Sequence, residues 1–131
     1  MIFGSVKKTI FMIRNMEMEN KMISDNFKQG NVFLIKAFYQ LTGETKIRPV
    51  AIVSNEKAID LDVIVTPITG QDKRNDFDVP IIKWQEAGLE KPSIARTSKL
   101  TMINYNNLYK KIGELHKDDL VNILGKCKEV F

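Results

Sequence analysis

The sequence predicts a mainly β domain that ends in one α-helix, folded as a small barrel or a curled antiparallel sheet. Short runs rich in β-branched and aromatic residues recur from residue 31 onward. Polar segments that contain glycine separate these runs, as turns do. One amphipathic stretch closes the chain, with apolar residues at the spacing of a single helical face: Leu120, Ile123, Leu124, Cys127 and Phe131.

Five strands are expected, over residues 31–38, 49–54, 61–69, 77–82 and 93–100. The polar segment 41–47 contains a glycine and is typical of a loop between the first two strands. Pro49 is acceptable at the first position of the second strand, whereas Pro67 must bend or end the third.

Two further segments are expected to contain short helices. Residues 83–92 are predicted to form one helical turn that Gly88 ends, because glycine takes the left-handed conformation at helix ends. Residues 105–115 are compatible with a short helix whose last residues are extended again. The final helix is the clearest, since Asp118 and Asp119 in its first turn complement the helix dipole.

The chain has 131 residues, which is enough for one domain with its own core. Residues 1–25 lack a strong period and are predicted to be an N-terminal extension of unknown role, whereas residues 26–131 form the domain. The net charge of +4 permits nucleic-acid binding without requiring it, because clustering matters more than the total. No apolar stretch is long enough to span a membrane, so we expect a cytoplasmic protein without a membrane partner.

Familiar catalytic motifs are missing from the sequence. There is no phosphate-binding glycine loop, no metal-binding histidine pair and no Gly-x-Ser-x-Gly elbow. His116 is the single histidine, and it is expected to cap the last helix or face solvent rather than act as a general base. Cys127 and Trp84 are expected to pack in the core rather than to serve as a nucleophile and a base-stacking platform.

Two arginines and a threonine near strand ends remain as candidates. Arg48 begins one expected strand, Arg96 lies within another, and Thr69 ends a third. A guanidinium presents a fixed fork of donors that matches phosphate oxygens and stays charged at every accessible pH. On chemistry alone, Arg48 is either a surface arginine that extends to solvent or a phosphate-binding residue on a rigid strand.

Four segments, in order, resemble the MazF/PemK family of bacterial type II toxin–antitoxin toxins: "KQGNVFLIKAF" (28–38), "IRPVAIVSN" (47–55), "VIVTPIT" (63–69) and "WQEAGLEKPSIARTSKLTMINYNNLYKKIGEL" (84–115). The resemblance covers residues 28–131 and implies the SH3-like barrel shared by CcdB-, MazF- and PemK-like toxins. It also implies a homodimer whose groove takes single-stranded RNA, and a cognate antitoxin that silences it. The implied activity is a metal-independent endoribonuclease, or mRNA interferase, that uses no cofactor and cuts mRNA by attack of the ribose 2′-OH.

The same resemblance implies roles for individual residues. Arg48 matches the catalytic arginine of the family's Arg-Pro, and Thr69 matches the threonine that binds or polarises the scissile phosphate. Arg96 matches an arginine that some members use beside an acidic residue two positions later. Ser98 occupies that second position here, so a carboxylate base is absent from it.

The remaining substrate contacts are expected from the segment "LTGETK", which would close over one side of the site. Thr42 and Glu44 lie in this segment, and Glu44 is one candidate for the group that removes the 2′-OH proton. Two alternatives stay open: a catalytically weak or inactive binding module, suggested by Ser98, and a CcdB-like poison of DNA gyrase. The RNA sequence that is cut and the identity of the antitoxin do not follow from the residues.

Overall fold

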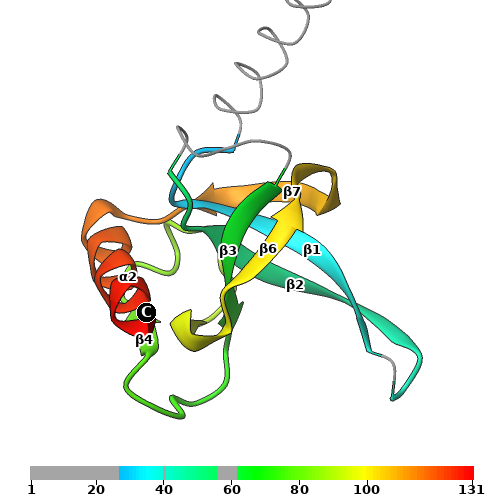
Figure 1. Ribbon diagram of the computed structural model, residues 1–131, viewed down its shortest axis with the longest axis horizontal. Coiled ribbons are helices and arrows are strands. Elements are labelled where there is room, and N and C mark those ends of the chain that lie inside the picture. The colour runs from blue at the N-terminus through cyan, green and yellow to red at the C-terminus, as the bar shows by residue number, and fades with distance from the viewer. Residues whose placement is uncertain (1–26, 40, 56–61) are drawn as a thin grey trace, which may run out of the picture.

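The computed structural model describes residues 27–39, 41–55 and 62–131 (Figure 1). The predicted extension over residues 1–25 lies outside the described residues, and the boundary at residue 26 stays a prediction. The described elements are seven strands and one α-helix: β1 (Asn31–Tyr39), β2 (Glu44–Ile52), β3 (Asp62–Thr69), β4 (Asp78–Ile81), β5 (Ser93–Arg96), β6 (Thr101–Asn104), β7 (Leu108–Glu114) and α2 (Lys117–Val130). Two single-turn 3₁₀ helices, η2 (Thr97–Lys99) and η3 (Tyr105–Asn107), flank β6.

The strands form one antiparallel sheet in the order β4-β5-β3-β2-β1-β7, with β6 paired to β3 beside β5. The mainly β fold class with a C-terminal helix is therefore confirmed. The described sheet curls without closing, because β4 and β7 form its two ends. Of the two predicted forms, the curled antiparallel sheet describes this chain better than the closed barrel.

Strand β3 changes its pairing partner halfway along its length. Asp62–Val65 pair with β6, whereas Ile68 and Thr69 pair with β5. Pro67 lies at this change and has no backbone N–H, so one ladder bond is missing there. The proline was expected to bend or end the strand. The strand does not end at Pro67 but continues to Thr69, while its neighbour changes from β6 to β5.

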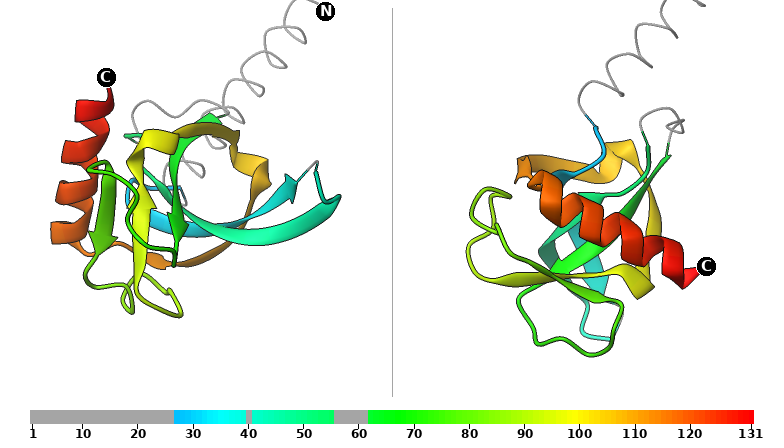
Figure 2. Two further views of the ribbon diagram at one scale, coloured as in Figure 1. Left: turned by 90° about the horizontal axis from the view of Figure 1, so that it is seen from below. Right: turned by 90° about the vertical axis from the view of Figure 1, so that its left-hand side faces the viewer.

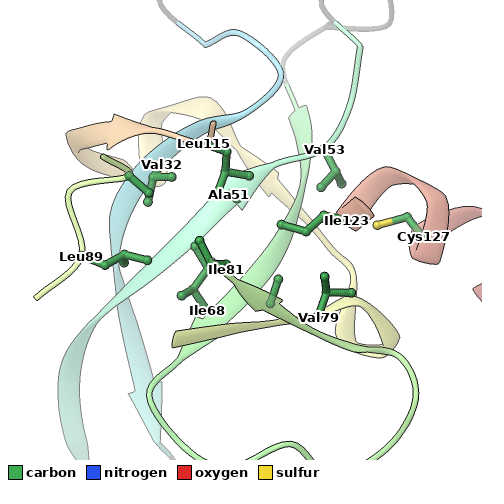
Figure 3. Packing of buried hydrophobic residues seen from close by; sticks show 12 residues of the cluster. Val32, Ala51, Val53, Ile68, Val79, Ile81, Leu89, Leu115, Ile123 and Cys127 are labelled. Atoms are coloured by element: carbon green, nitrogen blue, oxygen red, sulfur yellow. The ribbon is translucent and has the colours of Figure 1, made fainter. Parts of the chain in front are cut away.

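Both faces of the sheet are covered, which explains the uninterrupted apolar run that ends β2. On one face, Ala51 and Val53 pack with α2 residues Ile123 and Cys127 (Figure 3). On the other face, Val50 and Ile52 join a second cluster with Val63 and Val65 of β3, Phe33 of β1 and Leu108 of β7. Since successive side chains of a strand point to opposite faces, a strand buried on both faces needs no polar alternation.

Helix α2 lies across one end of the sheet beside β4 (Figure 2). The side chain of His116 caps it, because its Nδ1 accepts a hydrogen bond from the Asp118 N–H at 3.1 Å. Asp119 is buried, and its two carboxylate oxygens accept hydrogen bonds from the N–H groups of Ile82 (3.0 Å) and Lys83 (2.9 Å). The helix start is thereby tied to the segment that follows β4.

The predicted packing roles of the cysteine and the tryptophan are confirmed. Cys127 is buried on the apolar face of α2, and burial raises the pKa of its thiol. Trp84 is half-buried against the same cluster.

Some sequence-based predictions of elements differ from the structure in detail. The expected loop 41–47 is mostly strand, because β2 begins at Glu44 and pairs with β1 up to Tyr39 in a hairpin that projects from the sheet (Figure 1). The short helix expected within 105–115 is present as the single turn η3, and the extended part that was expected after it is β7, which pairs with β1. The strand expected over 93–100 ends at Arg96.

Residues 83–92 form turns rather than a helix. Gly88 has the left-handed conformation that was predicted, with φ of +80°. A β-carbon at this position would lie 1.9 Å from the Ile112 carbonyl oxygen, so the loop lies directly against the backbone of β7. Only glycine tolerates both the positive φ and the close approach of the Ile112 backbone.

Candidate functional site

A groove of about 960 Å³ runs between the projecting β1–β2 hairpin and the loops beside β5. Its lining comes from six parts of the chain: the hairpin, β3 with the loop after it, the segment 88–91, β5, β6 and Ile112 of β7. Arg48, Thr69 and Arg96 all line this groove, so it brings together three of the residues singled out in the sequence.

Arg48 lies on β2 at the point where the strand enters the core. Its backbone pairs with Ile35 of β1, and its side chain is exposed. Pro49 is half-buried and Val50 is fully buried. The guanidinium therefore projects from a strand whose next residues are fixed in the core.

Thr69 ends β3, and a hydrogen bond orients its hydroxyl group. The Oγ1 atom accepts from the Gln71 N–H at 3.2 Å, a common arrangement of threonine in tight turns. This bond uses a lone pair and leaves the O–H hydrogen available for donation. Thr69 can thus donate a hydrogen bond to an acceptor in the groove.

Lys91 crosses the groove wall over Gly70, the residue after Thr69. A β-carbon at Gly70 would lie 2.2 Å from Cε and 2.9 Å from Nζ of Lys91. The lysine side chain therefore occupies the space that any other residue at position 70 would need. The Lys91 ammonium group therefore lies beside Gly70, the residue that follows Thr69.

Arg96 lines the groove but is held by neighbours within the protein. Its Nη1 donates to Oδ2 of Asp78 at 2.7 Å, and the two side chains are only 9% and 1% exposed. Its Nη2 donates to Oε1 of Gln71 at 3.2 Å. The carboxylate partner of Arg96 thus comes from the opposite position on β4, not from residue 98.

The other predicted contacts do not line the groove within one chain. Thr42 and Glu44 are exposed near the tip of the hairpin, where Thr42 Oγ1 accepts from the Glu44 N–H at 3.3 Å. The carboxylate of Glu44 pairs with Lys46 at 3.5 Å. Ser98 is exposed in η2. Their assignment as substrate contacts stays a prediction.

Positive charge dominates the groove. Its basic lining residues are Arg48, Arg74, Lys91 and Arg96, and Glu90 is the one acidic residue among the described residues that line it. Arg74 and Lys91 were not singled out in the sequence. The charged segment "GQDKRND" gave a weak signal for Arg74, but nothing local to Lys91 indicates that it folds over Gly70.

In the part of the chain that the structure describes, no three His, Cys, Asp or Glu residues are grouped so as to hold a metal ion. Within the same ranges, every helix is too short or too polar to cross a bilayer.

Solved structures similar to this chain include several toxins. An endoribonuclease in complex with its cognate antitoxin, from a mycobacterial species, has a TM-score of 0.62 at 16% identity over 79% of this chain and 92% of its own. The MazE–MazF complex of Deinococcus radiodurans has a TM-score of 0.63 at 16% identity, over 79% of this chain and 94% of that chain. The toxin MazF-mt6 of Mycobacterium tuberculosis has a TM-score of 0.55 at 24% identity, over 74% and 96%. At these identities the likeness establishes the fold.

The family is established separately by sequence. A comparison with curated proteins gave no significant match. The model of PemK-like, MazF-like toxins of type II toxin–antitoxin systems matches residues 28–131, which is most of the chain. The chain therefore belongs to the PemK-like, MazF-like family of type II toxin–antitoxin toxins.

Proposed function

We propose that this toxin is an endoribonuclease that cuts single-stranded mRNA without a metal ion, and that Arg48 and Thr69 are its catalytic residues. The observation that supports this most directly is that both side chains line one basic groove in a chain of this family. The groove has the shape and charge for an extended, anionic strand.

The proposed reaction is attack of the ribose 2′-oxygen on the adjacent phosphorus. The O2′–P bond forms as the 2′-OH gives up its proton, and the P–O5′ bond breaks as the leaving 5′-oxygen takes up a proton, which leaves a cyclic phosphate and a free 5′-OH. Negative charge grows on the non-bridging oxygens as the reaction proceeds. Arg48 stabilises that charge, and Thr69 donates its O–H hydrogen to one of the same oxygens.

Arg48 acts by electrostatic stabilisation rather than by proton transfer, because a guanidinium group does not lose its proton in proteins. The hydroxyl of Thr69 needs no activation in this role. Its orientation is already fixed by the bond from the Gln71 N–H. Fixed donors of this kind need little reorganisation when the charge develops.

The first test is Arg48→Ala, assayed by primer-extension mapping of RNA cleavage and by growth arrest. Cleavage is expected to fall by at least about a hundredfold, the usual effect of removing one such donor. Lys46→Ala is the matched control, because Lys46 is an exposed cation on the same strand and does not line the groove. Equal cleavage by Arg48→Ala and Lys46→Ala would refute the assignment.

Two further tests address the mechanism: one changes the RNA substrate, and the other removes metal ions. An RNA with a single deoxyribose at the cut position should resist cleavage, because the attacking oxygen is missing. Rapid cleavage of that oligonucleotide or of all-DNA would contradict the mechanism. Activity should persist in EDTA, and inhibition would reveal a metal requirement.

The partners proposed for this chain are a second copy and a cognate antitoxin. Both proposals follow from membership of the family, and one of the similar solved structures is an endoribonuclease in complex with its cognate antitoxin. Light scattering at micromolar concentration should give the mass of a dimer. A monomeric mass there would count against the homodimer.

A second candidate function is that of a binding module with little or no turnover. Two observations favour it: Ser98 replaces the acidic residue, and Asp78 already pairs with Arg96. This alternative predicts RNA or antitoxin binding without cleavage. A measurable turnover number for the wild type refutes it, and a parallel gyrase assay tests the CcdB-like activity.

A further inference from the structure

Two arginines converge on one neutral oxygen in the wall of the groove. Gln71 Oε1 accepts hydrogen bonds from Nη2 of Arg96 at 3.2 Å and from Nη2 of Arg74 at 3.1 Å. Two guanidinium groups are thereby held side by side, with an uncharged amide between them. Such a pair is electrostatically favourable only when negative charge lies close by.

Asp78 carries a single negative charge, which can neutralise only one of the two guanidinium groups. It is buried, and its Oδ2 forms the ion pair with Arg96 at 2.7 Å. Among the described residues, no carboxylate lies within ion-pair distance of the Arg74 guanidinium. Within the described part of the chain, the Arg74 guanidinium thus has no ion-pair partner, and Arg74 is exposed on the groove.

The backbone of Arg74 is fixed even though its side chain is exposed. The Arg74 N–H donates to Oδ2 of Asp78 at 2.7 Å, the same oxygen that binds Arg96. The buried carboxylate of Asp78 thus anchors the loop at Arg74. The Gln71 Oε1 atom, which accepts a hydrogen bond from Nη2 of Arg74, orients the guanidinium group.

We propose that Arg74 is a phosphate-binding subsite for a phosphodiester that flanks the scissile one, and that Gln71 and Asp78 are its positioning residues. This inference rests on the proposed function, since the ligand is the same single-stranded RNA. The guanidinium fork matches two non-bridging oxygens, and the contact carries no sequence information. It adds affinity along the strand, while Arg48 and Thr69 act at the bond that breaks.

The test is the salt dependence of binding to an RNA oligonucleotide that carries one deoxyribose at the cut position. For single strands, each phosphate contact contributes about 0.7 to the slope of log affinity against log salt. Arg74→Gln should lower the slope by about that amount and weaken binding roughly five- to tenfold at low salt. The backbone bond to Asp78 survives this substitution, so the loop keeps its anchor.

Lys73→Gln is the matched control. Lys73 is the neighbouring exposed cation, and it lines an adjoining pocket, together with Pro80 and Trp84, rather than the groove. Both variants remove one positive charge from the same loop. Lys73→Gln should bind RNA like the wild type, so a general effect of net charge is separated from a direct contact.

Kinetics with the cleavable RNA give an independent readout. Arg74→Gln should raise KM and leave kcat within about twofold, because the flanking contact forms equally in the ground and transition states. Arg74→Lys should restore part of the salt slope. Thermal unfolding of both glutamine variants should match the wild type, because the two side chains are exposed.

The outcomes separate this subsite from the proposed function. If the wild type binds and cuts RNA while Arg74→Gln and Lys73→Gln behave alike, the subsite is overturned and the nuclease stands. A loss of kcat in Arg74→Gln, with KM unchanged, also overturns it by placing Arg74 at the scissile phosphate. If the wild type binds no single-stranded RNA, both assignments fall.

Discussion

Gly88 holds the loop before β5 against the backbone of β7, and replacing it by alanine gives the most quantitative test of the structure. The new β-carbon would lie 1.9 Å from the Ile112 carbonyl oxygen and 2.6 Å from its carbon. These are backbone atoms of a paired strand, so no side-chain rotation relieves the contact. The residue also has φ of +80°.

The two penalties can be estimated separately. A left-handed conformation costs a non-glycine residue about 1–2 kcal/mol. Forcing extra volume into a packed site costs about 1–3 kcal/mol. Gly88→Ala should therefore lower the free energy of unfolding by about 2–5 kcal/mol and the Tm by about 8–20 °C, at about 4 °C per kcal/mol for a domain of this size.

Two other glycines serve as matched controls in the same urea and thermal unfolding assays. Gly43 has φ of +68° but nothing within 4 Å of its added β-carbon, so Gly43→Ala should lose only the strain of about 1 kcal/mol. Gly125 lies inside α2 with open space around it, and Gly125→Ala should gain up to about 1 kcal/mol. If Gly88→Ala were no more destabilising than Gly43→Ala, the close approach to β7 would be refuted.

Three further predictions follow from single contacts. Gly70→Ala should displace the ammonium group of Lys91 without changing the net charge. RNA cleavage should therefore fall several-fold, while the Tm stays within a few degrees of the wild type. Unchanged cleavage would exclude a role for the Lys91 ammonium group. Asp119→Ala should cost about 2–4 kcal/mol, because two buried N–H groups after β4 lose their acceptor, and an unchanged unfolding midpoint would contradict this. Burial raises the pKa of Cys127, so its contribution to stability is complete below the unfolded thiol's pKa of about 8.5 and is lost as pH rises through the folded-state value. Iodoacetamide should accordingly modify it slowly at pH 7 until urea unfolds the chain, and fast modification of the native protein would place the thiol at the surface.

The parts of the fold that the sequence predicted are those with strong local patterns. The start of β1, the end of β2 and all of α2 carry apolar residues whose spacing reflects burial on known faces. The first half of β2 was missed because residues 44–48 are exposed, and their strand conformation depends on pairing with β1. Strand β7 was anticipated only in part, as the extended last residues of 105–115, because its conformation depends on pairing with β1.

The residues of the candidate site divide in the same way, into those that short local motifs predicted and those that depend on contacts between distant segments. Arg48 and Thr69 were predicted because each belongs to a short motif on a strand, and both line the groove. The contribution of Lys91 depends on a contact with Gly70, which lies far from it in the sequence. The carboxylate that neutralises Arg96 comes from the register of two strands, and no spacing along the chain indicates it.

The partner change along β3 has a consequence for how the molecule can open. In the described sheet, β3 is the single strand whose ladder hydrogen bonds join the β4–β5 pair to the β1–β2 hairpin. The groove walls come from both of these parts. A change in the twist of β3 near Pro67 would move these two parts of the sheet relative to one another, so the width of the groove depends on the conformation of this short stretch of backbone.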